Sequence, residues 1–237
     1  MTKATISCQD CTHSLCVGRV PIFSSLGQEA LDQIAALVTQ RDFAKGELIV
    51  PEGRDLGGLI IINSGRVKTF RYTSDGRERI LQILTDGDFV GEKNLLTRQR
   101  LTYSAEALVD TKTCFISREA FHRLMREYPD IIFDITSELC RRLERLEGMI
   151  QQLGLGEATQ RVIAVLWEFA QQYGEQTDSG TLISLPLSRE DLANYIGVTR
   201  ETISRKLNQM QAEGILRLIG NRKVLVYDLD SLVTRQH

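Results

Sequence analysis

Three cysteines near the start of the chain have the residue type and spacing of a metal or redox site. Cys8, Cys11 and Cys16 lie in the stretch SCQDCTHSLC (residues 7–16) and follow the pattern C-x2-C-x4-C. Thiolates at such spacing can surround one face of a metal ion or cluster while the backbone turns between them. A complete four-ligand site needs one more ligand from elsewhere in the chain.

Size and composition indicate an ordinary globular protein of one large domain or two modest ones. The chain has 237 residues, of which 42% are hydrophobic and 25% charged, and its formal net charge is −2. The first residues lack the apolar core of a secretory signal, and no apolar run approaches the roughly 18–20 residues that span a bilayer. We therefore expect a cytoplasmic protein without a membrane partner. In a reducing compartment, clustered cysteines are more often metal-binding or redox-active than structural disulfides.

A second group of residues with chemical potential lies near the C-terminus, in LSREDLANYIGVTRETISRKLNQMQAEGIL (residues 187–216). Ser188 is placed to cap one helix and Thr199 a second, and Gly197 between them can adopt the left-handed conformation. A helix, a tight turn and a second capped helix form the arrangement that places the second helix in the DNA major groove. The following RLIGNRKVLVYD predicts a β-hairpin, the wing of a winged helix.

The outward face of the second helix carries side chains suited to base edges. Arginine can donate two hydrogen bonds to guanine, glutamate can accept from the cytosine amino group, and serine can do either. Side chains at helix N-termini commonly contact phosphates. Seven basic residues against four acidic ones between positions 189 and 223 also fit an anionic partner. The predicted DNA-binding residues are Arg189, Thr199, Arg200, Glu201, Ser204 and Arg205.

The preceding chain is predicted to contain a helix, a β domain and further helices. Residues 25–41 have helical periodicity, with Ser25 placed as the N-cap. Short β-rich runs punctuated by glycines fill residues 42–117 and predict a small antiparallel β domain, with a hairpin turn at SDG (74–76). Helical periodicity returns over residues 117–129, 130–154 and 158–174. The polar residues 175–181 are predicted to form a loop.

The helix over residues 130–154 has the apolar spacing of a coiled coil. Its apolar residues are successively four, three, four and three positions apart. This spacing favours a dimer interface, and the alternative is a helix packed on its own domain. Cys140, on the same helix, is expected to be a small buried residue. The predicted seam consists of Leu139, Leu143, Leu146, Ile150 and Leu153.

The order of these elements resembles the CRP/FNR family of bacterial transcription regulators. The resemblance rests on LSREDLANYIGVTRETISRKL and on GRVKTFRYTSDGRERILQILTDGDFVGE (residues 65–92), and it covers nearly the whole chain. It implies an α+β fold in which an N-terminal β-roll, a jelly roll like those that bind cyclic nucleotides, precedes a long dimerisation helix and a C-terminal winged helix-turn-helix. The implied partners are double-stranded DNA, a second copy of the chain and RNA polymerase. The implied domains are a cysteine-bearing N-terminal arm (1–19), a β-roll sensor domain with flanking helices (20–126), the dimerisation helix (127–154) and the winged-helix DNA-binding domain (155–237).

Within that family the sequence is more similar to the FNR branch. Glu201, Ser204 and Arg205 stand at that branch's E-x-x-S-R spacing, which implies an inverted-repeat operator related to TTGAT and ATCAA. FNR-type proteins place a distant fourth cysteine in the context of TKTCFIS, so the resemblance suggests a [4Fe-4S] cluster held by Cys8, Cys11, Cys16 and Cys114. In the family, oxygen destroys such a cluster, and its loss weakens the dimer.

Other uses of these cysteines stay open. The commoner FNR spacing is C-x2-C-x5-C, one residue longer than the run in this chain. A zinc site with four thiolates needs similar geometry. A reversible disulfide between an arm cysteine and Cys114 is a further alternative.

The β-roll differs from the pattern for binding cyclic AMP. Members of the CRP branch hold that nucleotide with a Gly-Glu pair and an Arg-Ser pair. Gly91 and Glu92 are present, but Tyr103 precedes Ser104 where the pattern has arginine, so the phosphate would lack its bidentate partner. Cyclic AMP is therefore disfavoured, and a different organic effector in the roll is the remaining alternative of this kind. No nucleophile elbow, phosphate-cradling glycine loop or histidine–carboxylate pairing indicates an enzyme, so no catalytic residue is predicted.

Overall fold

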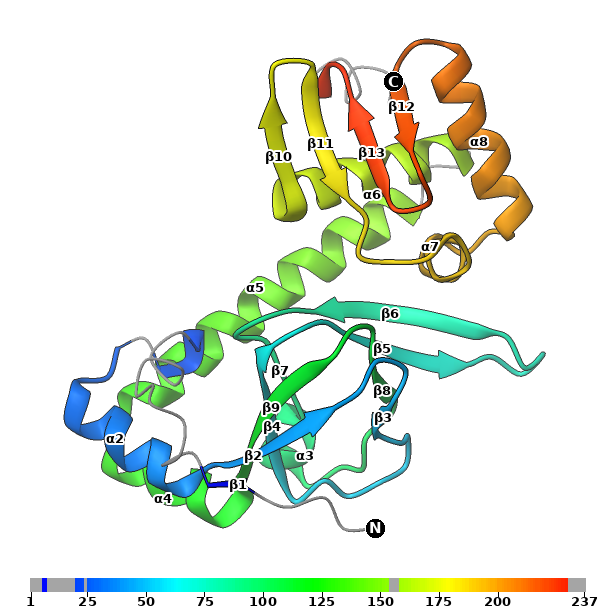
Figure 1. Ribbon diagram of the computed structural model, residues 1–237. Coiled ribbons are helices and arrows are strands. Elements are labelled where there is room, and N and C mark those ends of the chain that lie inside the picture. The colour runs from blue at the N-terminus through cyan, green and yellow to red at the C-terminus, as the bar shows by residue number, and fades with distance from the viewer. Residues whose placement is uncertain (1–5, 8–19, 24, 154–157, 230–237) are drawn as a thin grey trace. The chain divides into compact units, whose positions relative to one another are not determined.

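The computed structural model describes residues 6–7, 20–23, 25–153 and 158–229. The chain divides into two compact units, Met1–Leu143 and Glu144–His237, and the division falls within the long helix α5 (Asp130–Leu153) (Figure 1). The predicted fold class is confirmed, because a β-sheet domain with helices precedes α5 and a helix-turn-helix unit with its own small sheet follows it. In the part of the chain that is described, no helix is both long and apolar enough to cross a membrane.

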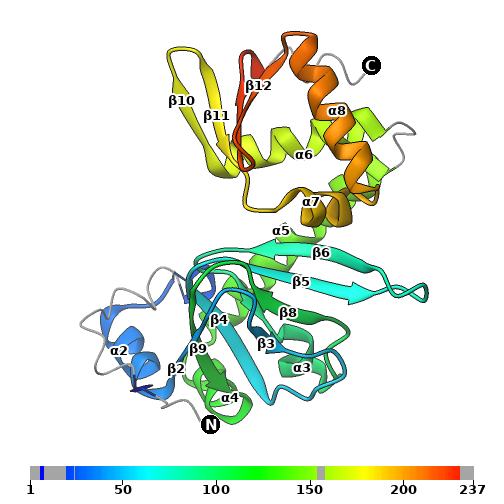
Figure 2. The same cartoon turned by 45° about the vertical axis from the view of Figure 1, so that its right-hand side comes forward.

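Two antiparallel sheets form the body of unit 1 (Figure 2). The first has the strand order β1-β2-β9-β4-β7 and the second the order β3-β8-β5-β6. The first sheet contains β1 (Ile6–Ser7), β2 (Thr39–Phe43), β4 (Gly58–Ser64), β7 (Phe89–Val90) and β9 (Thr111–Ser117). The second contains β3 (Leu48–Val50), β5 (Val67–Tyr72), β6 (Glu78–Leu84) and β8 (Ser104–Ala107). The helical elements of this unit before α5 are η2 (Pro21–Phe23), α2 (Gln28–Leu37), α3 (Glu92–Thr97) and α4 (Arg118–Glu127).

Strand β4 is buried on both faces, which explains its unbroken apolar run GLIIIN. Side chains alternate between the faces of a strand. Leu59 and Ile61 therefore join one apolar cluster, together with residues of η2, α2, α4 and α5. Ile60 and Ile62 join another, with residues of the second sheet. A continuous apolar run is typical of a strand covered on both sides.

The N-terminal helix differs from the prediction at both ends. Helix α2 begins at Gln28 with Gly27 as its N-cap, and no side chain caps it. Ser25, the predicted cap, instead bonds Asp134 of α5: its Oγ donates at 2.7 Å and its backbone N–H at 3.1 Å to the same carboxylate oxygen. The helix ends at Leu37, because residues 39–43 pair as strand β2 with β9. The predicted cap and the predicted helical end at residue 41 were therefore wrong.

The β domain was predicted in outline and incompletely in detail. Strands β3, β4, β5, β6 and β9 lie at β-rich runs within the predicted residues 42–117, and the turn at SDG joins β5 to β6 with Gly76 at φ 79°. Strands β2, β7 and β8 and the short helix α3 were not predicted. Helix α4, capped by Ser117, and α5 begin and end close to the predicted residues.

Unit 2 consists of three helices and a four-stranded sheet. The helices are α6 (Ala158–Tyr173), α7 (Arg189–Ile196) and α8 (Arg200–Ala212). The sheet order is β10-β11-β13-β12, with β10 (Gly174–Thr177), β11 (Gly180–Ser184), β12 (Leu216–Ile219) and β13 (Lys223–Val226). The predicted wing hairpin is confirmed as β12 and β13. The predicted loop over 175–181 was wrong, because most of it forms the β10–β11 hairpin.

Gly91, between β7 and α3, holds a position that a larger residue would disturb. Its φ is +100°, and a Cβ there would lie 2.5 Å from Leu56 Cδ2 and 2.7 Å from the Gly58 carbonyl oxygen. Gly76 provides a comparison, because its φ is +79° but nothing lies within 4 Å of its Cβ position. Alanine substitutions at these two glycines therefore distinguish the energetic cost of the left-handed backbone conformation from the cost of close packing.

We predict that Gly91→Ala destabilises unit 1 more than Gly76→Ala does. The left-handed conformation alone should lower the free energy of unfolding by about 1–2 kcal/mol in either variant. Overpacking should lower it by roughly a further 1–3 kcal/mol in Gly91→Ala. Urea unfolding followed by a probe in the β domain measures both losses, and equal losses would contradict the close packing at Gly91.

Candidate functional site

Helix α7 is fixed at both ends by local interactions. The Ser188 hydroxyl accepts a hydrogen bond from the Asp191 N–H at 3.1 Å, and the Ser188 N–H donates to the Asp191 carboxylate at 3.3 Å. These reciprocal bonds form a capping box. The helix ends at Gly197, whose φ of 80° lies in the left-handed region. The predicted cap and turn are confirmed.

Helix α8 begins immediately after that turn. The Thr199 side chain caps it by accepting a hydrogen bond from the Thr202 N–H at 3.2 Å. Ile203, Leu207 and Met210 are buried and fix the rotation of the helix about its axis. The opposite face, which includes Glu201 and Arg205, is exposed.

The predicted DNA-binding residues occupy the N-cap and first two turns of α8 and the start of α7. Thr199, Arg200, Glu201 and Arg205 are exposed, and Ser204 is half-buried. The backbone N–H of Glu201 and the Thr199 hydroxyl lower the pKa of the Glu201 carboxyl, so it is an ionised acceptor at neutral pH. The first two turns of α8 therefore present two guanidinium donors and one carboxylate acceptor.

Arg189 differs from the other five residues because it is half-buried at the start of α7. Burial lowers its pKa, although a guanidinium stays protonated at neutral pH. Its Nη1 is a buried donor with no hydrogen-bond acceptor among the described residues. A phosphate oxygen is the kind of acceptor that would satisfy such a group.

The wing adds exposed cations that the sequence analysis did not assign to the site. Arg217 lies on β12, Arg222 in the turn and Lys223 at the start of β13, and all three are exposed. The Leu185 N–H donates to the Arg222 carbonyl at 2.8 Å, which ties the wing turn to the segment before α7. The excess of basic residues between 189 and 223 was the available signal for them.

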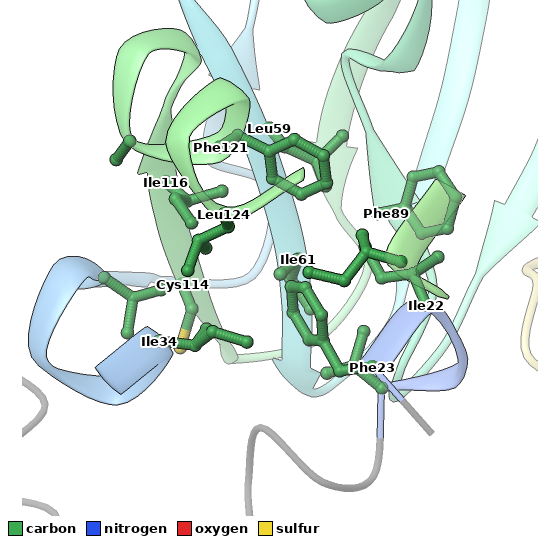
Figure 3. Close-up of a cluster of buried hydrophobic side chains, with 14 of the residues drawn as sticks. Ile22, Phe23, Ile34, Leu59, Ile61, Phe89, Cys114, Ile116, Phe121 and Leu124 are labelled. Atoms are coloured by element: carbon green, nitrogen blue, oxygen red, sulfur yellow. The ribbon is translucent and has the colours of Figure 1, made fainter. Parts of the chain in front are cut away.

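Cys114 is buried in unit 1 with 5% of its surface exposed. It projects from β9 toward Ile34 of α2, within the apolar cluster that also contains Ile61, Leu124 and Val20 (Figure 3). We call this group of residues the helical-side cluster. Burial in apolar surroundings restricts the access of solvent and reagents to a thiol.

The other three predicted ligands, Cys8, Cys11 and Cys16, lie outside the described residues. The chain on either side of them is described. Strand β1 ends at Ser7, and in its ladder Ile6 pairs with Gln40 of β2, which in turn pairs with Cys114 of β9. Val20, on the other side, is buried in the helical-side cluster. Among the residues that the structure describes, no group of three or more His, Cys, Asp or Glu side chains could hold a metal ion.

Helix α5 carries the predicted dimer seam, and part of this seam is exposed. Leu143 is 56% exposed, whereas Leu139 packs partly against the helical-side cluster. The side chains of Leu146, Ile150 and Leu153 lie outside the described part of the structure. Phe133 is 73% exposed on the same helix and was not predicted. Cys140 is exposed, so the prediction that it is buried was wrong.

Glu92, Tyr103 and Ser104, which stand where the family pattern binds cyclic AMP, interact with neighbouring groups of the protein. Burial raises the pKa of Tyr103, and the adjacent Glu92 carboxylate raises it further, so the phenol is neutral. The Ser104 hydroxyl accepts a hydrogen bond from the Glu52 N–H at 3.0 Å. The Glu92 carboxylate lies 3.7 Å from the guanidinium of Arg142 on α5.

Two family models match the chain. Residues 40–128 match the cyclic nucleotide-binding domain, and residues 160–235 match the Crp-like helix-turn-helix domain. Together they cover most of unit 1 after β1 and most of unit 2.

Proteins similar to this chain include several kinds of regulator. A cyclic AMP receptor protein of Thermus thermophilus is 32% identical over 84% of this chain and 88% of its own length. An anaerobic regulatory protein of Pasteurella multocida is 29% identical over 96% of this chain and 82% of its own. The structure of FixK2 from Bradyrhizobium japonicum superposes with a TM-score of 0.73 at 26% identity, covering 83% of this chain and 96% of the other. The chain therefore belongs to the CRP/FNR family of DNA-binding transcription regulators.

Proposed function

We propose that this protein is a redox-responsive regulator of the FNR type. It binds an inverted repeat related to TTGAT and ATCAA as a homodimer, and Cys8, Cys11, Cys16 and Cys114 hold a [4Fe-4S] cluster that responds to oxygen. RNA polymerase is its partner at the promoter. The observation that carries the DNA-binding part is the exposed face of the first two turns of α8.

These two turns combine the groups suited to reading bases with the Thr199 cap that orients the helix. Arg200 and Arg205 can donate to guanine, and the ionised Glu201 can accept from a cytosine amino group. Arg189 and the wing cations Arg222 and Lys223 are suited to phosphates, which position a protein on the duplex without reading its sequence. The proposed DNA interface thus consists of a helix that contacts bases and of surrounding cations that contact phosphates.

We predict that Arg205→Ala weakens binding to a duplex with TTGAT and ATCAA half-sites by about 1–3 kcal/mol. The loss should be much smaller on a duplex in which the G of TTGAT is replaced, because the guanine contact is then already absent. Fluorescence anisotropy at one fixed salt concentration measures both affinities.

Arg222→Ala is the matched control for that experiment. As a phosphate contact, Arg222 should weaken binding equally on the two duplexes and reduce the salt dependence of binding. If Arg205→Ala behaves like Arg222→Ala, then Arg205 contacts phosphate and the proposed base readout is wrong.

The cysteine part of the proposal is supported by where the chain enters and leaves the cysteine segment. Cys8 and Cys11 follow Ser7 by one and four residues, and Cys16 precedes Val20 by four. Four residues of extended chain reach roughly 14 Å. Ser7 is two strands from β9, and strands are spaced by about 4.8 Å. Each of the three cysteines is therefore within reach of the layer that contains Cys114.

Cys114 has the chemistry and the setting that such a site requires. Thiolates are the ligands of iron–sulfur clusters, and an apolar shell limits the access of solvent to them. Strands β2 and β4 pair with β9 on either side and hold the Cys114 backbone in place. When bound, a cluster would supply an oxygen-labile link between the N-terminal segment and β9.

The packing around Cys114 connects this position to α5. Ile131 and Ile135 of α5 belong to the same helical-side cluster as Cys114 and Val20. Ser25 adds a polar link through its two hydrogen bonds to Asp134. Residues that follow the cysteine segment thus contact the helix that carries the proposed dimer seam, so tying that segment to Cys114 would stabilise one arrangement of α5.

We predict that protein purified without air contains iron and acid-labile sulfide in matched amounts, and that Cys114→Ser loses both. Cys140→Ser is the matched control, because Cys140 is exposed on α5 and is not part of the proposed site; it should retain both. Cys8→Ser should lose the metal without altering the buried cluster of side chains. Metal and sulfide analysis of the four proteins provides the measurement.

Two results would overturn the iron–sulfur assignment, and a third would change its set of ligands. Stoichiometric zinc without sulfide would identify a four-thiolate zinc site. A disulfide bond between an arm cysteine and Cys114 would identify a thiol–disulfide switch. Mass spectrometry of peptides should then detect this bond only after metal-free protein has been oxidised. Unchanged iron in Cys114→Ser would remove that residue from the site.

A further inference from the structure

Four exposed cations of unit 1 are grouped on α3 and on the loops beside it. Arg54 lies between β3 and β4, Lys93 on α3, and Arg98 and Arg100 between α3 and β8. We call these four residues the cationic patch. None of them forms an ion pair with another described residue. The whole chain has a formal net charge of −2, so this local excess of positive charge is not a general property of its surface.

The acidic residues beside the patch are already paired with other arginines. The Glu52 carboxylate lies 3.2 Å from the guanidinium of Arg71. The Asp55 carboxylate lies 3.0 Å from that of Arg118. Neither carboxylate is therefore available to neutralise the patch from within the chain, and the patch presents a positive potential to a partner.

Asn94 of α3 holds the two loops of the patch together. Its side chain is fully buried and makes four hydrogen bonds. The amide oxygen accepts from the Gly57 N–H at 3.0 Å and from Arg118 Nη2 at 2.9 Å. The amide nitrogen donates to the Asp55 carboxylate at 2.8 Å and to the Gln99 carbonyl at 2.9 Å. A buried amide with all of these partners ties the loop before β4 to the loop after α3.

Backbone hydrogen bonds join the same two loops a second time. The Leu101 N–H donates to the Arg54 carbonyl at 3.0 Å, and the Gly53 N–H donates to the Leu101 carbonyl at 2.8 Å. The backbones that carry Arg54 and Arg100 are thus adjacent. Binding to a surface that is held in this way loses less conformational entropy than binding to free loops.

Arg98 has a backbone conformation that favours glycine. It is the C-cap of α3 with φ +57°, and it is the only non-glycine residue with a positive φ in the described ranges. Glycine or asparagine is usual at such a helix end, because most other side chains are strained there. Strained backbone of this kind is concentrated at functional positions. An arginine at this point therefore indicates a use for its exposed guanidinium.

An exposed apolar residue beside the cations indicates the kind of partner. Leu96 is 47% exposed and follows Lys93 by three residues on α3, so the two share one face of the helix. The phosphates of a duplex would pair with the cations but offer nothing apolar to Leu96. An acidic protein segment can supply both carboxylates and an aliphatic side chain. Arginine is also enriched at protein–protein interfaces, where its guanidinium pairs with carboxylates through two parallel hydrogen bonds.

We propose that the cationic patch and Leu96 form a docking surface for an acidic segment of another protein. Carboxylates of that segment pair with the arginines and with Lys93, and one aliphatic side chain packs on Leu96. The surface lies within unit 1 and includes neither the cysteines nor the winged helix, so it goes beyond the proposed function.

A labelled peptide of glutamates around one central leucine tests the surface on the full-length protein. Arg100→Glu should weaken binding of this peptide at least about tenfold at 150 mM salt, measured by fluorescence anisotropy. Arg126→Glu is the matched control, because Arg126 is an exposed arginine at the other end of α4 from Arg118. Eight residues of helix separate the two by roughly 12 Å, which exceeds the Debye length of about 8 Å. The control should bind within about twofold of the wild type, and equal losses in the two variants would overturn the proposal.

Leu96→Ser tests the apolar part of the surface. It should weaken binding of the leucine peptide about threefold or more, and it should have little effect on a peptide in which serine replaces that leucine. The comparison isolates the contact between the two side chains. The same loss with both peptides would show that Leu96 does not contact the partner.

Arg98→Gly distinguishes a binding role from a structural one. Glycine relieves the strain at φ +57°, so the urea midpoint of the β domain should be at or above that of the wild type. Affinity for the peptide should nevertheless fall about threefold, as expected for the loss of one exposed charge pair. A lower midpoint would show that Arg98 is required for the fold of the loop and would overturn its assignment to the surface.

DNA provides the last comparison. In Arg100→Glu and Leu96→Ser, affinity for the operator and for a duplex without half-sites should stay within about twofold of the wild type. If Arg100→Glu weakens binding to the duplex without half-sites as much as it weakens binding to the peptide, the patch contacts phosphates and the proposal is wrong. Because retained operator binding is measured separately, failure of the docking surface and failure of the proposed function can be told apart.

Discussion

The packing of α5 against the β-roll is the interaction on which the rest of this structure depends. Ile131 and Ile135 fill the space between the first sheet and the helices that cover it, next to Cys114. A fully buried aliphatic side chain contributes about 1.5–3 kcal/mol, whereas a typical hydrogen bond such as that of Ser25 contributes about 0.5–1.5 kcal/mol. The apolar contact therefore fixes α5 to the roll, and the polar contacts determine how the helix is oriented there.

Elements whose signals are local were predictable from the sequence. Ser188, Gly197 and Thr199 each act on a neighbouring backbone group, so their residue types alone indicated the two helices and the turn. Ser25 was misleading for the opposite reason: its partner Asp134 is 109 residues away. Strand β10 was missed because all four of its residues are exposed, so its sequence has no alternation of apolar and polar residues to indicate a strand.

The candidate functional residues also differ in whether the sequence alone could predict them. The proposed reading face of α8 comes from one short stretch, and the structure exposes four of the five side chains that the sequence singled out there. The contacts of Arg142 were not predictable, because Phe89 and Glu92 are about fifty residues earlier and only the folded roll brings them to α5. Apolar periodicity indicated the seam on α5. It gave no indication that a charged residue on the same helix would be buried.

Helix α5 is attached to the roll at two places with different physical character. Ile131 and Arg142 are eleven residues apart, which corresponds to roughly 16 Å along the helix axis. Apolar packing at the first place tolerates small rotations, because dispersion contacts are individually weak and not directional. The guanidinium at the second place is directional, since its planar donors must meet the Phe89 carbonyl while its face stacks on the ring.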